Sequence, residues 1–234
     1  MNRISIFIIS VIVMFFGGSA WAQHLTISNT GETGASGSNW SIIGNVLQIS
    51  SSNVSANVHP SVIENHLTNT GNLTITIPKI IGTTRSITIA NSISYSGNTN
   101  RTLTFNAPNH FYISSGANIT SSIAALNLVF RAVCLPGSPD NGIVQIVNSS
   151  INTNGGHLWI AGGPSDATWN GLTVGNHYAR TWTDDVKGLE IIGSNINTNG
   201  GHLYIAGYSW NSANTSGNNF GIDIDFTSIN TAAG

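Results

Sequence analysis

The chain has 234 residues, of which 40% are hydrophobic and 7% are charged, and its net charge is −2. Ordinary globular domains carry a charge at about a quarter of their positions. The low charge excludes a basic surface for nucleic acid or anionic lipid, and the recurring Ile, Leu and Val exclude a disordered chain.

The first 22 residues have the pattern of a secretory signal peptide. Arg3 supplies the positive charge, residues 4–16 are almost wholly apolar, and Ala20-Trp21-Ala22 forms a small-x-small cleavage site. The apolar run is shorter than the ~20 residues that a membrane span needs. We therefore expect residues 1–22 to be removed on export and the mature chain to be secreted or held at the cell surface, with no membrane span.

Residues 23–70 are less regular than the rest of the chain. Residues 25–49 contain strand-like pieces, and the apolar spacing over residues 60–67 predicts a short helix. A stack of strands needs its open end covered, because an exposed sheet edge pairs with other chains. We expect residues 23–70 to form an N-terminal cap.

From residue 71 to residue 234, short segments with apolar residues at alternate positions predict strands. The segments fall into rows of three that keep one order, while the link between the first and second segments varies in length. The phrase SINTNGGHLWIAGG recurs as NINTNGGHLYIAGY and again as SINTAAG. The rows begin at Leu73, Leu103, Leu126, Leu158 and Leu203, their second segments begin at Ser86, Phe111, Ile143, Leu189 and Ile222, and their third segments begin at Ser92, Asn118, Ser150, Asn195 and Ser228.

Three short strands and three turns per row predict an all-β parallel β-helix, in which stacked rows form parallel sheets. An antiparallel sandwich or barrel is the alternative, but it needs hairpin turns between neighbouring strands and does not explain the fixed order. Because the sequence stops inside a row, we expect it to be part of a longer protein.

Inward columns of stacked apolar residues should hold the rows together. Leu103, Leu126, Leu158 and Leu203 are expected in one column, Phe105, Leu128, Ile160 and Ile205 in the next, and Thr104, Asn127, Trp159 and Tyr204 on the outer face between them. We expect Asn152, Asn197 and Asn230 to hydrogen-bond from row to row, and the Gly-Gly pairs to form corners.

One long run carries a resemblance to a known family. The sequence SITIANSISYSGNTNRTLTFNAPNHFYISSGANI, followed by LNLVF, the INTNGGHL repeats and the lead-in HPSVIENHLTNTGNLTI, resembles the haemagglutinin-like repeats of filamentous haemagglutinin-type bacterial exoproteins. The resemblance covers about residues 40–234 and implies right-handed coiling and an exported adhesin or surface exoprotein. The Asn-Pro-Asn motifs of the two-partner secretion domain are missing, so the resemblance leaves the export route open.

Aromatic side chains are the candidate binding residues. Rigid aromatic surface suits contact with glycans or proteins, although the rings can instead pack the inserted loops onto the strands. Tyr208 also lies in one of these loops. The candidates are Trp159 and Tyr204 in the outward column, Trp169, Tyr178 and Trp182 in the insertion 162–186, and Trp210 in the next loop.

Signals for chemistry are weak, so we expect no enzyme activity, no cofactor and no metal. Asp223 and Asp225 share one strand face, which is the basis of the alternative, a β-helix polysaccharide hydrolase or lyase. His157 and His202 should stack at ~5 Å, without a third ligand near them in sequence.

The Thr-x-Thr segments and the single cysteine do not predict a functional site. A flat Thr-x-Thr array for ice binding starts at residues 74–76 and 102–104 but is broken by Asn127, Trp159 and Tyr204. Cys134 has no activating neighbour, so we expect a buried, inert thiol.

Overall fold

The computed structural model describes residues 23–34, 36–50, 54–78, 84–133, 142–181, 187–209 and 220–232. This part of the chain is mostly β-strand, and it contains the helix α1 (Pro60–Asn69), which confirms the helix predicted at residues 60–67. Among the described residues, no helix is long and apolar enough to cross a membrane. The predicted signal peptide, residues 1–22, and Cys134 lie outside the described residues.

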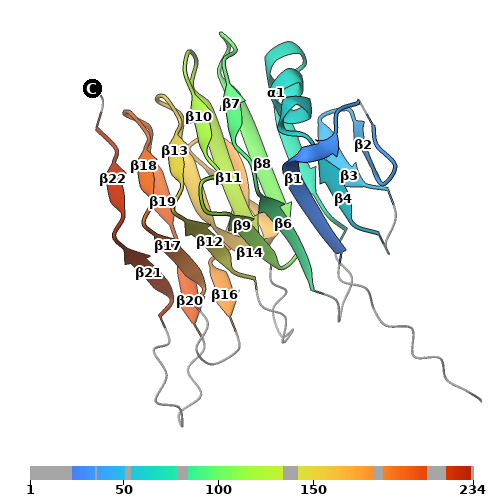
Figure 1. The fold of residues 1–234 in the computed structure, drawn as a ribbon. Helices are drawn as coiled ribbons and strands as arrows, with labels where there is room; N and C mark the ends of the chain where they lie inside the picture. Colours follow the sequence, from blue (N-terminus) through green and yellow to red (C-terminus); the bar gives the residue numbers. More distant parts are fainter. Residues whose placement is uncertain are drawn as a thin grey trace, which may run out of the picture.

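Three large sheets contain most of the strands, as Figure 1 shows. We call these sheets A, B and C, and all neighbouring strands in sheets A and C pair in parallel. In sheet B the antiparallel pairs are β2 (Trp40–Ile43) with β3 (Val46–Ile49) and β14 (Leu158–Trp169) with β15 (Leu172–His177). Sheet A is ordered β21 (Ile222–Asp225), β17 (Leu189–Ile192), β12 (Val144–Val147), β9 (His110–Ile113), β6 (Arg85–Ile89), β1 (Gln23–Glu32), β4 (Ala56–Val58).

Sheets B and C follow the same progression along the molecule. Sheet B is ordered β15 (Leu172–His177), β14 (Leu158–Trp169), β11 (Leu126–Ala132), β8 (Arg101–Ala107), β5 (Leu73–Thr76), β3 (Val46–Ile49), β2 (Trp40–Ile43), and β19 (Leu203–Ile205) also pairs with β14. Sheet C is ordered β22 (Ser228–Asn230), β18 (Asn195–Asn197), β13 (Ser150–Asn152), β10 (Ile119–Ser121), β7 (Ile93–Tyr95). A small sheet D pairs β16 (Ala179–Thr181) with β20 (Gly207–Ser209).

In the rows that begin with β5, the chain visits the three large sheets in one order, from B to A to C, and then returns to B. Strands β5, β6 and β7 form the first of these rows, and β8, β9 and β10 form the next. Each later strand lies beside its counterpart in the row before, in parallel. The predicted strand rows and their parallel pairing are confirmed.

The register of β11 differs from the predicted one by two residues. Leu128, not Leu126, lies beside Leu103, and Val129 rather than Asn127 lies beside Thr104. A shift of two residues leaves each side chain on its own face, so both leucines remain buried. The shift brings Phe130 beside Phe105, and both rings lie near Phe111 of sheet A.

These three phenylalanines fill the space between sheets A and B. The Phe111 ring centroid lies 4.6 Å from that of Phe130 and 5.0 Å from that of Phe105, and all three side chains are fully buried. Ring pairs at these separations add to the stabilisation that comes from burying their apolar area. The interior of the molecule is therefore a continuous apolar core between the sheets.

The repeated INTNGGHL phrase is a corner between sheet C and sheet B. Asn154 and Gly155 adopt positive φ angles of 49° and 91°, and the Thr153 hydroxyl donates to the Gly156 carbonyl at 2.5 Å. A Cβ on Gly156 would lie 2.2 Å from the Leu126 carbonyl oxygen of the preceding row. The glycine is required because successive corners touch through their backbones.

The predicted row-to-row hydrogen bonds between Asn152, Asn197 and Asn230 are wrong in their partners. Asn152 and Asn197 accept hydrogen bonds from backbone N–H groups two residues ahead, those of Asn154 and Asn199, at 3.0 and 2.9 Å. Each side chain therefore closes its own turn, as Asx turns do. The row-to-row amide bond instead joins Asn199 to Asn154, at 3.4 Å.

Helix α1 lies beside β7, the edge strand of sheet C, at the end of the molecule where the chain begins (Figure 1). The Glu64 carboxylate accepts the Ser94 backbone N–H at 2.7 Å, and Arg101 Nε donates to the Leu67 carbonyl at 2.8 Å. Glu64 thus provides a partner for a backbone group that the edge of a sheet would leave to water.

Replacing Gly156 by alanine should lower the free energy of unfolding by about 3 kcal/mol, because the new Cβ meets the backbone of the preceding row. The matched control is Gly116→Ala, where φ is +84° but no atom lies within 4 Å. That control should cost only about 1 kcal/mol for its left-handed backbone. Urea unfolding of both variants measures the difference, and equal losses would contradict the backbone contact.

Candidate functional site

The insertion that the sequence suggested to be a loop begins with a β-hairpin. Residues 166–169 of β14 pair antiparallel with residues 172–175, and Asn170 and Gly171 turn the chain with φ angles of 46° and 75°. Two successive positive φ values match a type I′ hairpin turn, for which Asn-Gly is the preferred sequence. The Asn-Gly dipeptide between Trp169 and Leu172 was the signal that the sequence analysis missed.

This hairpin covers part of the outer face of sheet B. Leu172 and Val174 from the hairpin pack with Val129, Trp159 and Ala161 from the sheet, forming an apolar cluster separate from the main core. Full burial of a large apolar side chain contributes about 1.5–3 kcal/mol. The cluster therefore fixes the hairpin to the sheet.

Trp159 is accordingly not available to a ligand. Its side chain lies on the outer side of sheet B, as the alternation of the strand requires, but it is only 2% exposed beneath the hairpin. The expectation that its ring contributes binding surface is corrected here. The covering hairpin, which sequence alternation does not reveal, is the physical reason.

Tyr204 is the exposed ring next to Trp159. The two rings stack with centroids 5.9 Å apart and planes 6° apart, and Tyr204 is 41% exposed. Trp169 of the hairpin lies 5.9 Å from Tyr204 on another side. Packing on two indoles holds the phenol ring in place, so its face is presented in one orientation.

A second aromatic pair lies at sheet D, with Tyr208 on β20 and Tyr178 directly before β16. Tyr178 and Tyr208 stack at 5.0 Å and are each 37% exposed, and the Arg180 guanidinium lies 5.6 Å from the centre of the Tyr208 ring. A cation over a ring face is a favourable contact. Tyr178, Tyr204, Tyr208 and Trp169 are called the aromatic patch below. Trp182 and Trp210, which were also predicted to bind, lie outside the described residues.

His157 and His202 stack beside this patch, as expected, with ring centroids 5.0 Å apart. The His202 backbone N–H donates to His157 Nδ1 at 3.0 Å, which requires that nitrogen to be unprotonated. Burial and, secondarily, the neighbouring His202 lower the pKa of His157. In the described part of the chain, no three His, Cys, Asp or Glu side chains gather as a metal site would need.

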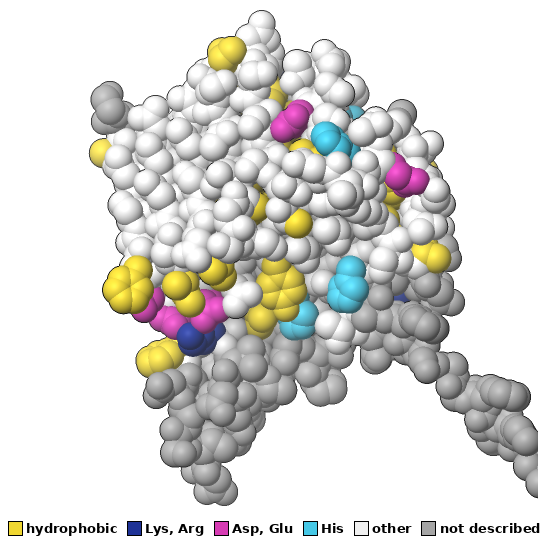
Figure 2. Space-filling model, viewed as in Figure 1, with side chains coloured by type: hydrophobic (Ala, Val, Ile, Leu, Met, Phe, Trp, Pro, Cys, Tyr) yellow, Lys and Arg dark blue, Asp and Glu magenta, His cyan; other side chains and the backbone are white. Residues whose placement is uncertain are grey.

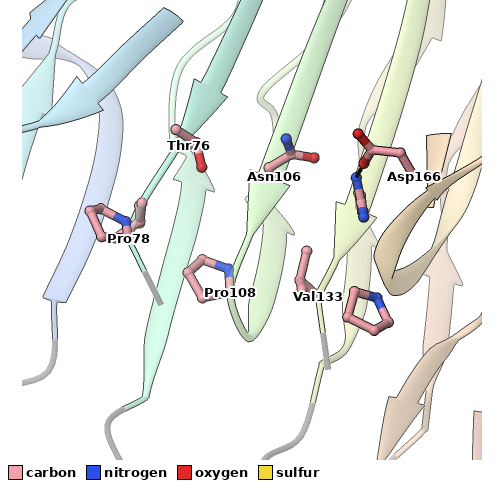
Figure 3. Close-up of a pocket in the computed structure, with 9 residues that line it drawn as sticks. Thr76, Pro78, Asn106, Pro108, Val133 and Asp166 are labelled. Carbon is pink, nitrogen blue, oxygen red and sulfur yellow. Dashed lines mark hydrogen bonds and ion pairs between the residues drawn. The ribbon is translucent and has the colours of Figure 1, made fainter. Parts of the chain in front are cut away.

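Arg131 and Asp166 were not singled out from the sequence, yet they join the hairpin to the sheet. Arg131 on β11 is 6% exposed and donates through Nε to the Gly163 carbonyl at 2.8 Å and through Nη1 to Asp166 at 2.6 Å. Both residues line a cavity, and Figure 3 shows Asp166 on one side of it, Thr76 on the other and Asn106 between them. An arginine inside the apolar strand LNLVFRA was the available signal, because a buried arginine needs a partner.

Asp223, one of the two carboxylates considered for catalysis, belongs to an ion-pair network on sheet A. Lys187 Nζ lies 2.6 Å from Asp223 and 2.7 Å from Glu190, and these bonds raise the pKa of Lys187. Asp223 is therefore joined through the lysine to Glu190 of the neighbouring strand rather than to Asp225. In Figure 2, acidic side chains and a basic one gather beside apolar ones near β17 and β21, on a face that is otherwise sparsely charged.

His110 lies on the outer face of sheet A, in register with Ser86 and, beyond it, His24. The Ser86 hydroxyl and His24 Nδ1 are 2.5 Å apart. Burial, together with the nearby His24, lowers the pKa of His110 to about 4. The folded chain thus holds a neutral imidazole at a pH where an unfolded histidine is charged.

No family model matches the chain, and no curated protein or solved structure matches it either.

Acidification should destabilise the protein between pH 6.5 and pH 4. In this window the unfolded chain binds a proton at His110 that the folded chain does not, so the free energy of unfolding falls as pH falls. The expected loss for this group is on the order of 3 kcal/mol. His110→Gln should flatten the pH dependence measured by urea unfolding, whereas the exposed control His177→Gln should leave it steep, and equal slopes in both variants would contradict the assignment.

Proposed function

We propose that the protein is a secreted or cell-surface adhesin-like binding protein without catalytic activity, built on a right-handed parallel β-helix. The fixed order of strands through sheets B, A and C, with parallel neighbours throughout the repeated rows, supports the β-helix. Parallel strands joined by crossovers are right-handed in almost all known cases, which supports the hand. In this β-helix, residues 23–70 act as the N-terminal cap.

The resemblance to filamentous haemagglutinin-type exoproteins supports the same function. The segments that carry the resemblance, from SITIANSISYS to INTNGGHL, are the rows of strands and their corners. The resemblance thus concerns the stacked rows of strands. An elongated stack of rows that carries inserted loops on its outer faces is suited to adhesion. We further propose that residues 1–22 direct export, and that the partners are glycans or proteins rather than nucleic acid.

One observation carries the binding function, namely the exposed rings of the aromatic patch held on a rigid support. Tyr204 is stacked on a buried indole and Tyr208 on Tyr178. Ordering a side chain at an interface costs about 0.5–1.5 kcal/mol, and a ring that is already fixed avoids most of that cost. Aromatic faces also pack against the C–H surfaces of sugars and against apolar protein groups, which makes tyrosine frequent in binding surfaces.

An enzyme is the alternative function, and the ion-pair network on sheet A is the observation that favours it. Glu190 and Asp223 lie side by side on β17 and β21 and share Lys187. Glycoside hydrolysis uses a pair of carboxyl groups that flank the scissile bond, and these two residues supply such a pair. Release of reducing ends from a polysaccharide panel, abolished by Asp223→Asn, would establish this alternative.

Glycan-array binding of the full chain, exported with its own leader, tests the binding function. We expect retention on at least one glycan, and the double variant Tyr204→Ala with Tyr208→Ala should weaken it by about tenfold or more through loss of two anchoring rings. Ile43→Ala, at an exposed apolar side chain of sheet B outside the patch, is the matched control and should bind normally. Unchanged binding by the double variant would exclude the patch as the contact surface.

A further inference from the structure

Two cavities lie on the outer face of sheet B against the β14–β15 hairpin. One has a volume of about 300 Å³ and is lined by Thr76, Asn106, Arg131 and Asp166, with three prolines at its edge. The other has a volume of about 220 Å³ and lies under the hairpin turn, between Gly171 and the threonines of β5 and β8. The hairpin therefore forms a wall of both cavities.

The floors of the two cavities are continuous. Thr74 and Thr76 are alternate residues of β5, and Thr104 and Asn106 are alternate residues of β8. Across the two strands, Thr74 lies beside Thr104 and Thr76 lies beside Asn106. Alternate residues of a strand are ~6.8 Å apart on the same face, and neighbouring strands are ~4.8 Å apart. We call this surface the polar groove. It follows β5 and β8 over Asn72 to Pro78, a length of ~20 Å.

The floor of the polar groove offers hydrogen-bonding groups without net charge. Threonine hydroxyls both donate and accept, and Arg131 and Asp166, which neutralise each other, are the charged residues among the described residues that line the two cavities. The Asp166 side chain is 71% exposed, so its carboxylate remains accessible to a donor from solution. A neutral ligand is favoured, because an ionic one would have to compete with this pair.

The side-chain oxygen of Asn106 is an acceptor that needs a hydrogen-bond donor. Its Oδ1 atom is buried and has no hydrogen-bond partner. Figure 3 shows the Asn106 amide on the floor of the cavity, with its oxygen toward the side where Asp166 lies. A buried acceptor without a partner costs about 1–3 kcal/mol. Rotation of the Asn106 amide toward the cavity that it lines would let a ligand hydroxyl donate to this oxygen and recover that cost.

We propose that the polar groove binds a neutral oligosaccharide, with its chain laid along β5 and β8. Its hydroxyl groups pair with Thr74, Thr104 and the Asn106 oxygen, and the rings of Pro78, Pro108 and Pro164 contact its C–H faces at one end. The hairpin separates this site from the aromatic patch. The ligand class rests on the proposed binding function, whereas the location of the site does not.

Backbone NMR of the isotope-labelled full chain, exported with its own leader, tests the site with defined probes at 10 mM. These are linear tetrasaccharides of glucose, mannose and galactose, and tetragalacturonate as the acidic comparison. We expect at least one neutral probe to shift the amide signals of residues 72–76 and 102–106. The amide signals of Tyr204 and Tyr208 report separately on the aromatic patch.

Three variants separate binding from folding. Asn106→Leu removes the unpaired acceptor, so it should weaken probe binding by about tenfold while leaving the thermal midpoint unchanged or raised. Thr104→Trp fills the groove and should abolish the shifts. Thr120→Val, which removes an outward hydroxyl of sheet C, is the matched control and should bind as the unsubstituted chain does.

Each outcome decides the proposal. Shifts in the groove that Asn106→Leu weakens support it, even if the aromatic patch proves inert on the glycan array. The proposal is overturned if no neutral probe shifts the groove, if the shifts occur only at Tyr204 and Tyr208, or if only tetragalacturonate binds. It is equally overturned if Asn106→Leu binds as tightly as the unsubstituted chain.

Discussion

The lateral contact between successive rows is the constraint on which the rest of the structure depends. Strands of neighbouring rows pair in parallel and in register, and at the corners one backbone lies directly on the next. A Cβ on Gly201 would lie only 2.0 Å from the Gly156 carbonyl oxygen. Because the spacing between strands is fixed by hydrogen bonding at ~4.8 Å, the corner sequence has little freedom to change. The recurrence of INTNGGHL is a consequence of this spacing.

A scaffold constrained in this way can vary only on its outer faces and in the links between strands. The insertion that begins within β14 shows the result. It returns as a hairpin across sheet B, buries Trp159, supports Tyr204 from one side and forms the wall of the polar groove on another. One insertion thereby divides a uniform sheet face into an aromatic surface and a polar one. Arg131, whose partners Gly163 and Asp166 lie at the base of the hairpin, fixes its position.

Row stacking also determines which charged and titratable groups interact. Some of the few charged residues form ion pairs that join neighbouring strands, as Lys187 does with Glu190 of β17 and Asp223 of β21. His110 lies on sheet A and His157 lies at the corner before β14, and burial lowers the pKa of each below the usual histidine value. Register in a parallel sheet thus determines which side chains interact, and a residue's neighbours are those at the same position one row away.

The sequence by itself determined the strand rows, their parallel stacking, the helix at residues 60–67 and the glycine corners, because each depends on local alternation or on a repeated phrase. It placed β11 two residues out of register, because alternation with a period of two cannot separate registers that differ by two. Only the tertiary structure decided that Trp159 is covered, that Asn152 closes its own turn, and that Thr76, Asn106 and Arg131 line one cavity. The cover on Trp159 and the lining of the cavity depend on residues that row stacking and the fold-back of the hairpin bring together. The Asn152 turn depends on the backbone angles of its own corner, which alternation along the sequence does not reveal.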